Sequence, residues 1–406
     1  MLALAVTLAC MLAVLSSALD TKHIEALVAP PFQLERHTVR SDGYLLALFR
    51  LSPPGSAPPT RRVPVLLHHG FGFSANVWFV LPRDQGLPYI LYDAGYDVWA
   101  LSERGTTHSL RHETLSPLHR EFWRFTMDDL ALRDLPAFLD YVLGTTGASS
   151  LATGSTQTFM LGAGQPNSSA ATRVCHHVAL TPVFFPQRIS QPLLLRVLLT
   201  SGIDRAILHL DAQLVPPGLT AGLLGPTCAA QLMDARPFKQ AAAEAACEHA
   251  LVSTYGAPSL TSQEALTRLS SLTWPSTFAA GVPAQYAQAV RRGGYDTPLL
   301  AKFDYGSVCG VPLWGAACNQ RVYGARQPPL YDLSQYRIPA TIVSGGADLV
   351  SVPWDVSNVL LRLPPGVLRS TVNLTGHAHL DVVAYDARAY SASVIQALQS
   401  SCSASA

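Results

Sequence analysis

Three residues of this sequence have the types and the chain order of a hydrolytic triad. Ser155 lies in the polar stretch SSLATGSTQT, Asp348 ends the glycine-rich stretch VSGGAD, and His379 lies in GHAHLD. A serine attacks a carbonyl carbon when a histidine takes its proton and a carboxylate orients that histidine. The order serine, acid, histidine favours this assignment. Chemistry alone does not choose between His379 and its neighbour His377.

A second stretch offers backbone donors for the negative oxygen that forms in such a reaction. His68, His69 and Gly70 follow the first strongly apolar run, and Phe71 comes next. A His-Gly stretch at the end of a strand is typical of an oxyanion hole, to which the following N–H contributes. We therefore predict the amide of Phe71 as one donor. If Ser155 is the nucleophile, the amide of Thr156 is the second.

Composition excludes some classes of function. The chain has 406 residues, of which 49% are apolar and 14% charged, and its net charge is +1. A balanced charge gives no indication of a nucleic acid or strongly acidic partner. The sequence contains neither CxxC nor HExxH, and we predict no metal and no cofactor.

The first 18 residues predict a secretory signal peptide, because an apolar run too short to span a membrane precedes small residues. Six cysteines remain after its removal, an even number that suits an oxidising compartment. From local spacing we favour the pairs Cys228–Cys247 and Cys309–Cys318. Two sequons, at Asn167 and Asn373, predict glycosylation. We expect a secreted or lysosomal protein without a stable membrane span.

Short apolar runs alternate with helical patterns and predict an α/β fold with a mostly parallel sheet. The runs at 63–67, 96–100 and 340–343 each end in glycine or polar residues. Ligands collect at that edge of such sheets. The segment 184–300 is instead rich in Leu and Ala with helical periodicity, and predicts a helical cap. The core is then formed by residues 19–183 and 301–406.

The chain also resembles the acid lipase family of gastric and lysosomal acid lipases. The matching motifs, in chain order, are GYDVW (95–99), SxRG (102–105), SP (116–117), EFWxF (121–125), DLP (134–136), ALTPV (179–183), FDYG (303–306), QPPxY (327–331), SGGxD (344–348) and HLD (379–381). The resemblance implies an α/β-hydrolase fold with a helical cap and cleavage of triacylglycerols or steryl esters at a lipid–water interface. It implies Asp348 as the acid and His379, which heads HLD, as the base.

The nucleophile position departs from that family, whose serine lies in Gly-His-Ser-Gln-Gly. In one alignment register TGSTQ (153–157) replaces this pentapeptide, and Ser155 is the nucleophile despite Thr153 and Gln157 in place of glycines. In the other register Gly154 is the last glycine, so that Ala152 occupies the nucleophile position. Both registers leave too few apolar residues before the serine for a central strand of usual length.

Two hypotheses follow. In the first the protein is a lipase that hydrolyses lipid esters with Ser155, Asp348 and His379. In the second it is a non-catalytic lipid-binding relative whose nucleophile elbow is deleted. The sequence does not distinguish triacylglycerol from steryl ester as the substrate.

Overall fold

The computed structural model describes residues 24–402, apart from 54, 56–62, 190–192, 203–244, 246–247, 275, 295, 308 and 310–316. The predicted signal peptide and the predicted pair Cys228–Cys247 lie outside the described residues. Among the described helices, none is long and apolar enough to cross a membrane.

A nine-stranded sheet forms the centre of the molecule, in the order β1-β2-β4-β3-β6-β7-β8-β9, with β5 paired to β2. β1 is antiparallel to β2, and β2 is antiparallel to β4. The remaining strands on this path, in the spatial order β4, β3, β6, β7, β8 and β9, are parallel to one another. The strands are β1 (Gln33–Ser41), β2 (Tyr44–Ser52), β3 (Pro64–Leu67), β4 (Asp97–Leu101), β5 (Arg111–His112), β6 (Leu151–Thr153), β7 (Val174–Leu180), β8 (Ala340–Gly345) and β9 (Leu368–Leu374). The predicted fold class is confirmed.

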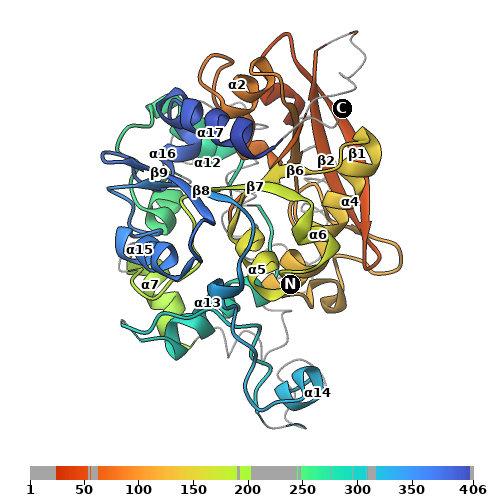
Figure 1. Ribbon diagram of the computed structural model, residues 1–406, viewed down its shortest axis with the longest axis vertical. Coiled ribbons are helices and arrows are strands. Elements are labelled where there is room, and N and C mark those ends of the chain that lie inside the picture. The colour runs from red at the N-terminus through yellow and green to blue at the C-terminus, as the bar shows by residue number, and fades with distance from the viewer. Residues whose placement is uncertain are drawn as a thin grey trace, which may run out of the picture.

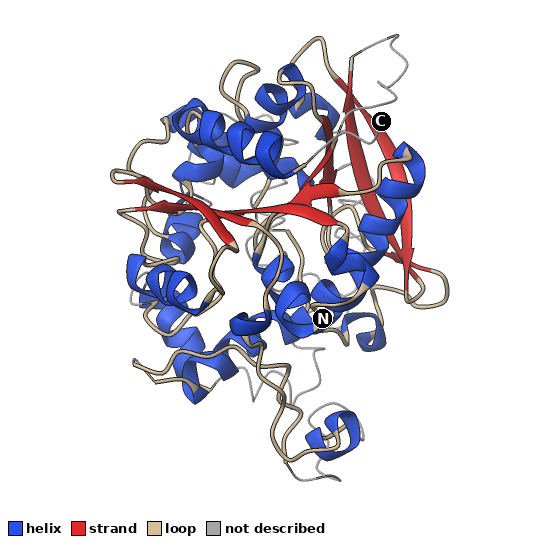
Figure 2. Ribbon diagram, in the orientation of Figure 1, coloured by secondary structure: helices blue, strands red, loops and turns tan. Residues whose placement is uncertain are grey.

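Helices cover both faces of the sheet (Figures 1 and 2). On one face lie α4 (Leu135–Thr146), α5 (Thr156–Gly164), α6 (Ser169–Thr172) and α15 (Pro353–Arg362), and on the other α2 (Leu87–Asp93), α16 (Asp381–Ala384) and α17 (Arg388–Ser401). Alternate residues of each strand enter different cores: Leu66 packs on the first face, whereas Val65 and Leu67 pack on the second. This two-residue period is what a sheet buried on both faces requires.

The central strand β6 is present but has only three residues. It pairs in parallel with β3 on one side and with β7 on the other. Leu151 packs into one core and Ala152 into the other, and both are fully buried. Backbone pairing on both sides and burial on both faces therefore hold the short strand that the few apolar residues of this segment can form.

The described residues of 184–300 contain helices and no strand. These helices are α7 (Leu193–Thr200), a helical stretch over 248–255, α12 (Gln263–Leu272) and α13 (Gly281–Arg292). Leu199 and Ala287 join α7 to α13 and pack with Val350, which follows the predicted acid. The segment predicted as a cap therefore lies against the loops that carry the candidate site.

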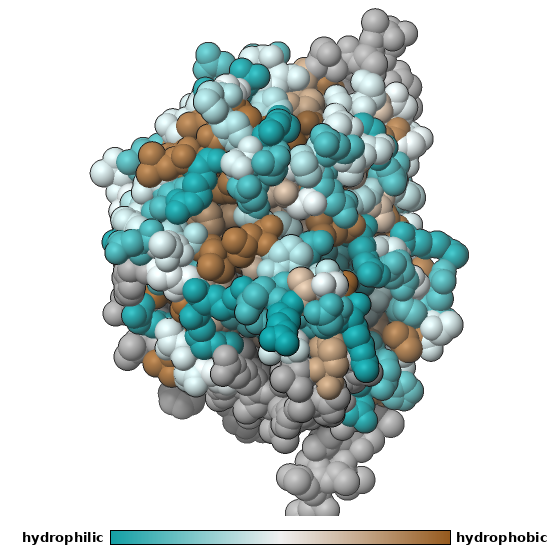
Figure 3. Space-filling model, turned by 60° about the horizontal axis from the view of Figure 1, so that its bottom comes forward, coloured by the Kyte–Doolittle hydropathy of each residue, from teal (hydrophilic) through white to brown (hydrophobic). Residues whose placement is uncertain are grey.

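Two disulfides occur among the described residues. Cys309–Cys318 has the local spacing that we favoured, whereas Cys175–Cys402 joins β7 to the residue after α17. Asn167 and Asn373 are both exposed, as glycosylation would require. On the face shown in Figure 3, apolar residues appear in small groups among hydrophilic ones.

Candidate active site

A cavity of about 200 Å³ lies between the carboxyl ends of the central strands and the cap. The predicted site residues Phe71, Ser155, Thr156 and His379 line it. Most of its wall is apolar and comes from both parts of the chain, including Val65, Leu91, Val178, Leu199, Val282 and Tyr286. An enclosed apolar space with a few polar groups at one end is typical of a site for an apolar ligand.

Asp348 and His379 form a hydrogen-bonded pair, with 2.8 Å between Asp348 Oδ2 and His379 Nδ1. The other oxygen of Asp348 accepts hydrogen bonds from the N–H groups of Val350 and Ser351, both at 2.8 Å. Because the carboxylate accepts at Nδ1, that nitrogen carries a hydrogen, and Nε2 is left for exchange with groups in the cavity. His377 makes no such contact: both of its ring nitrogens are buried without a partner among the described residues.

Close packing of two loops brings this pair together. A Cβ atom on Gly345 would lie 2.3 Å from the carbonyl oxygen of His377, and one on Gly346 would lie 2.5 Å from that of Thr375. Only glycine allows an approach of this kind. The two glycines of the VSGGAD stretch thus let the loop of Asp348 lie directly on the loop of His379.

Asp381 fastens the histidine loop to the cap. Its carboxylate accepts hydrogen bonds from the backbone N–H groups of Ser259, Leu260, Thr261 and Ala378 and from the Thr261 hydroxyl, at 2.7 to 3.1 Å. Burial alone would raise the pKa of Asp381, but these hydrogen bonds lower the pKa below its ordinary value. The sequence identified Asp381 only as part of a motif, and the structure shows what it holds.

Ser155 lies at the turn between β6 and α5, immediately before the first residue of that helix. Its φ of 128° is unusual for a residue other than glycine. Ala152, the nucleophile position in the other register, lies inside β6 and is fully buried. Of the two, only Ser155 occupies the strand-to-helix turn where a nucleophile is presented.

Thr153 and Gln157, which stand in for the two glycines of Gly-His-Ser-Gln-Gly when Ser155 is the nucleophile, both make side-chain hydrogen bonds. Thr153 Oγ1 donates to the carbonyl oxygen of Leu66 at 3.0 Å. Gln157 Nε2 donates to Glu103 Oε1 at 2.8 Å. Both side chains are therefore accommodated beside Ser155, and each makes a hydrogen bond to a group in or just after a neighbouring strand.

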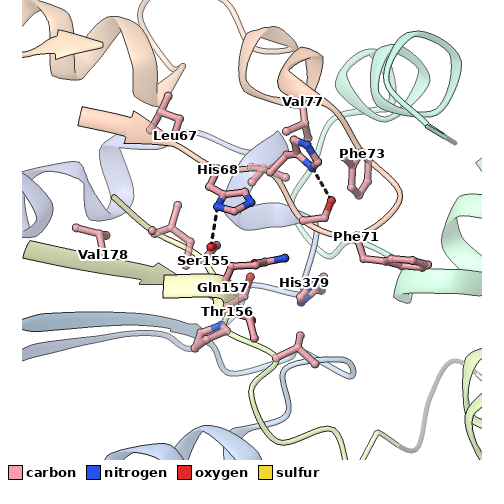
Figure 4. Close-up of a pocket in the computed structure, with 18 of the residues that line it drawn as sticks. Leu67, His68, Phe71, Phe73, Val77, Ser155, Thr156, Gln157, Val178 and His379 are labelled. Carbon is pink, nitrogen blue, oxygen red and sulfur yellow. Dashed lines mark hydrogen bonds between the residues drawn. The ribbon is translucent and has the colours of Figure 1, made fainter. Parts of the chain in front are cut away.

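The side chain of Ser155 contacts His68 and not His379. Ser155 Oγ lies 2.9 Å from His68 Nδ1, and His68 Nε2 lies 2.7 Å from Glu103 Oε1. Among the described residues, no hydrogen bond joins Ser155 to His379. Figure 4 shows the His68 ring turned toward Ser155 and His379 set apart from it, nearer Phe71. The structure thus brings Asp348 and His379 together but leaves Ser155 with a different histidine.

The residues of the two predicted oxyanion donors both line the cavity. Phe71 is in the turn after β3, and Thr156 is the first residue of α5, where N–H groups have no partner within the helix. Tyr255, from the cap, donates its hydroxyl hydrogen to the carbonyl oxygen of Phe71 and stacks on His379 with 6.0 Å between ring centroids. One cap residue therefore contacts both the oxyanion loop and the candidate base.

Sequence reasoning missed His68 and Glu103 as contacts of Ser155. His68 was considered only as part of the His-Gly stretch, and Glu103 as the variable position of SxRG. A signal was present, since both follow apolar strands whose carboxyl ends meet at one edge. Their contact depends on the order β4-β3-β6 in the sheet, which the sequence did not provide.

Comparison with known proteins agrees with this architecture. Residues 30–81 match the family described as the partial alpha/beta-hydrolase lipase region. Human lipase member K is 29% identical over 81% of this chain and 78% of its own length. Human gastric triacylglycerol lipase is 28% identical over 86% of this chain and 83% of its length, and Arabidopsis thaliana triacylglycerol lipase 1 is 28% identical over 87% and 83%. With the ordered motifs, these matches show that the chain is similar over most of its length to gastric and other triacylglycerol lipases.

Proposed function

We propose that this protein hydrolyses carboxylic esters of lipids, with Ser155 as the nucleophile. The observation that carries the proposal is the placement of Ser155 and His379 in the wall of one apolar cavity, with Asp348 hydrogen-bonded to His379. Ser155 attacks the ester carbonyl carbon to give an acyl-enzyme, which water then hydrolyses. The amides of Phe71 and Thr156 hold the oxyanion, and the His379–Asp348 pair transfers protons. No cofactor enters this reaction.

The substrate class follows from the cavity and the relatives. Apolar side chains from core and cap surround the polar end of the cavity, which suits an acyl chain better than a charged group. The relatives are named as lipases, two of them as triacylglycerol lipases. We include contact with a lipid–water interface in the proposal, because esters of this class gather there.

The same proposal includes a secreted or lysosomal location, because disulfides persist in oxidising compartments. The pairs Cys175–Cys402 and Cys309–Cys318 support it, and so does the predicted signal peptide.

Release of fatty acid from emulsified triacylglycerol and from a cholesteryl ester tests the function. The wild-type protein should release fatty acid from at least one of them, and Ser155→Ala should reduce the rate at least about 10⁴-fold. Ser149→Ala, an exposed serine of the same stretch, is the matched control and should keep full activity. Binding of these lipids without any release would favour the non-catalytic alternative instead.

A further inference from the structure

We propose that Ser155 gives its proton to His68, which Glu103 orients, and that the Asp348–His379 pair exchanges protons with the leaving alcohol and the attacking water. This inference rests on the proposed function, because it assigns the proton transfers within the same site. In a single triad one histidine makes all the proton transfers, whereas here two histidine–carboxylate pairs share them.

The directions of the hydrogen bonds around Glu103 define the state of His68. Glu103 Oε1 accepts from the amide of Gln157 at 2.8 Å and lies 2.7 Å from His68 Nε2. An oxygen that already accepts from an amide is an acceptor for the histidine as well, so His68 Nε2 carries the hydrogen. His68 Nδ1 therefore has a free lone pair, and the Ser155 hydroxyl donates to it at 2.9 Å. These contacts have the nucleophile–base–acid geometry of a catalytic relay.

The His68–Glu103 pair is buried and held from several sides. The His68 side chain is 2% exposed and that of Glu103 9%. The N–H of Glu103 donates to His69 Nε2 at 3.1 Å, and His69 Nδ1 in turn donates to the carbonyl oxygen of Gly70 at 2.9 Å. Burial lowers the pKa of His69, which keeps this supporting ring neutral. Hydrogen bonds shielded from water in this way are stronger than exposed ones.

His379 has the opposite character. Its side chain is 16% exposed, its partner Asp348 is fully buried, and its Nε2 makes no hydrogen bond to Ser155 among the described residues. The ring lies in the cavity wall against Tyr255. A leaving alcohol or an incoming water reaches His379 more easily than His68, because the His68 side chain is the more buried of the two.

The cycle balances when it starts with His68 neutral and His379 protonated. As the Ser155 oxygen bonds to the ester carbonyl carbon, its proton moves to His68 Nδ1. The bond from that carbon to the alcohol oxygen breaks, and the alkoxide takes the proton of His379. A water then gives a proton to His379 while its oxygen bonds to the acyl carbon. The bond to Ser155 breaks, and Ser155 recovers its proton from His68.

Labelling by a fluorophosphonate isolates the first transfer, because fluoride leaves without needing a proton. His68→Gln and Glu103→Gln should each lower the labelling rate constant about 100-fold or more, the usual contribution of a base. His379→Gln should lower it less than tenfold. His377→Gln is the matched control, since that histidine contacts none of the reacting groups, and thermal melting checks that each variant is folded.

A greater loss of labelling in His379→Gln than in His68→Gln, or an equal one, overturns the inference but leaves Ser155 as the nucleophile. Failure of the wild-type protein to be labelled overturns the proposed function as well. A second readout does not require His68 variants to fold: His379→Gln should still release about one equivalent of p-nitrophenol from p-nitrophenyl butyrate in a rapid first turnover, because that leaving group needs no proton, while its steady-state turnover falls at least tenfold. Loss of the rapid first turnover in His379→Gln contradicts the division of roles.

Discussion

Two histidine–carboxylate pairs lie at one cavity, whose wall includes His68, Glu103 and His379, and the two pairs differ in exposure. The side chains of His68 and Glu103 are both buried and are hydrogen-bonded to Ser155 and Gln157. His379 is partly open to the cavity, and only its carboxylate, Asp348, is fully enclosed. A buried pair suits a proton that stays within the protein, whereas an open pair suits protons exchanged with the ligand. This difference is the basis of the two roles that we propose for the pairs.

The supports of the two pairs also differ. The open pair depends on glycine contacts between two loops and on Asp381, which bonds the cap. The buried pair depends on Gln157, whose side-chain amide donates to Glu103. Substitution of Asp381 should therefore affect the His379–Asp348 pair alone, and substitution of Gln157 should affect the His68–Glu103 pair alone.

The largest effect should come from Asp348→Asn. The shape of the pair is kept, but the amide cannot hold His379 in the required tautomer, and kcat on an alkyl ester should fall about 10⁴-fold. His377→Ala should change kcat by less than twofold. Steady-state hydrolysis of ethyl butyrate measures both, and a loss of less than tenfold in Asp348→Asn would remove Asp348 from the catalytic machinery.

Asp381→Ala should affect only the open pair. Four backbone N–H groups lose their acceptor, which should lower the free energy of unfolding by about 1–3 kcal/mol. Activity on ethyl butyrate should fall with the loosening of the His379 loop, while fluorophosphonate labelling of Ser155 stays within threefold of wild type. Denaturant unfolding and labelling rates test the two statements, and an equal fall in both activities would show that the pairs are not separate.

Acid should remove the contribution of Asp381 to stability. Its pKa in the folded protein lies below the ordinary value of 3.8, so the stabilisation is fully present above that pH and is lost as the pH falls below it. The difference in melting temperature between wild type and Asp381→Asn should accordingly be largest near neutral pH and shrink below pH 3.8. A difference in melting temperature that grows as the pH falls would contradict a lowered pKa of Asp381 in the folded protein.

The smallest effect should come from Gln157→Ala, which removes one hydrogen bond to Glu103. The expected cost is about 1 kcal/mol of stability, and the labelling rate should fall no more than about tenfold. Activity on the two butyrate esters should change in equal proportion, because the open pair is untouched. A preferential loss on ethyl butyrate would connect Gln157 to His379 instead.

The parts of the fold that local patterns encode were predictable. The apolar runs that became β3, β4 and β8 end in the expected polar residues, and VSGGAD and HLD placed Asp348 and His379 on loops that meet. Cys309–Cys318 followed from spacing, whereas Cys175–Cys402 joins residues 227 positions apart. Local spacing carries no information about such a distant pair.

The surroundings of Ser155 were harder to predict, because they depend on contacts between segments that are far apart in the sequence. β6 has too few apolar residues to be recognised alone, and it exists because β3 and β7 pair with it on both sides. The contact between Ser155, His68 and Glu103 likewise needs the ends of three adjacent strands. A pattern within one segment cannot supply the order of strands in the sheet.

The central claim is that Ser155 is a working nucleophile, and mass spectrometry of the folded protein after fluorophosphonate treatment tests it most directly. We expect one phosphonyl adduct, carried by the peptide that contains Ser155, and no adduct in Ser155→Ala. A wild-type protein that acquires no adduct, or that carries it on another residue, would show that Ser155 is not the nucleophile.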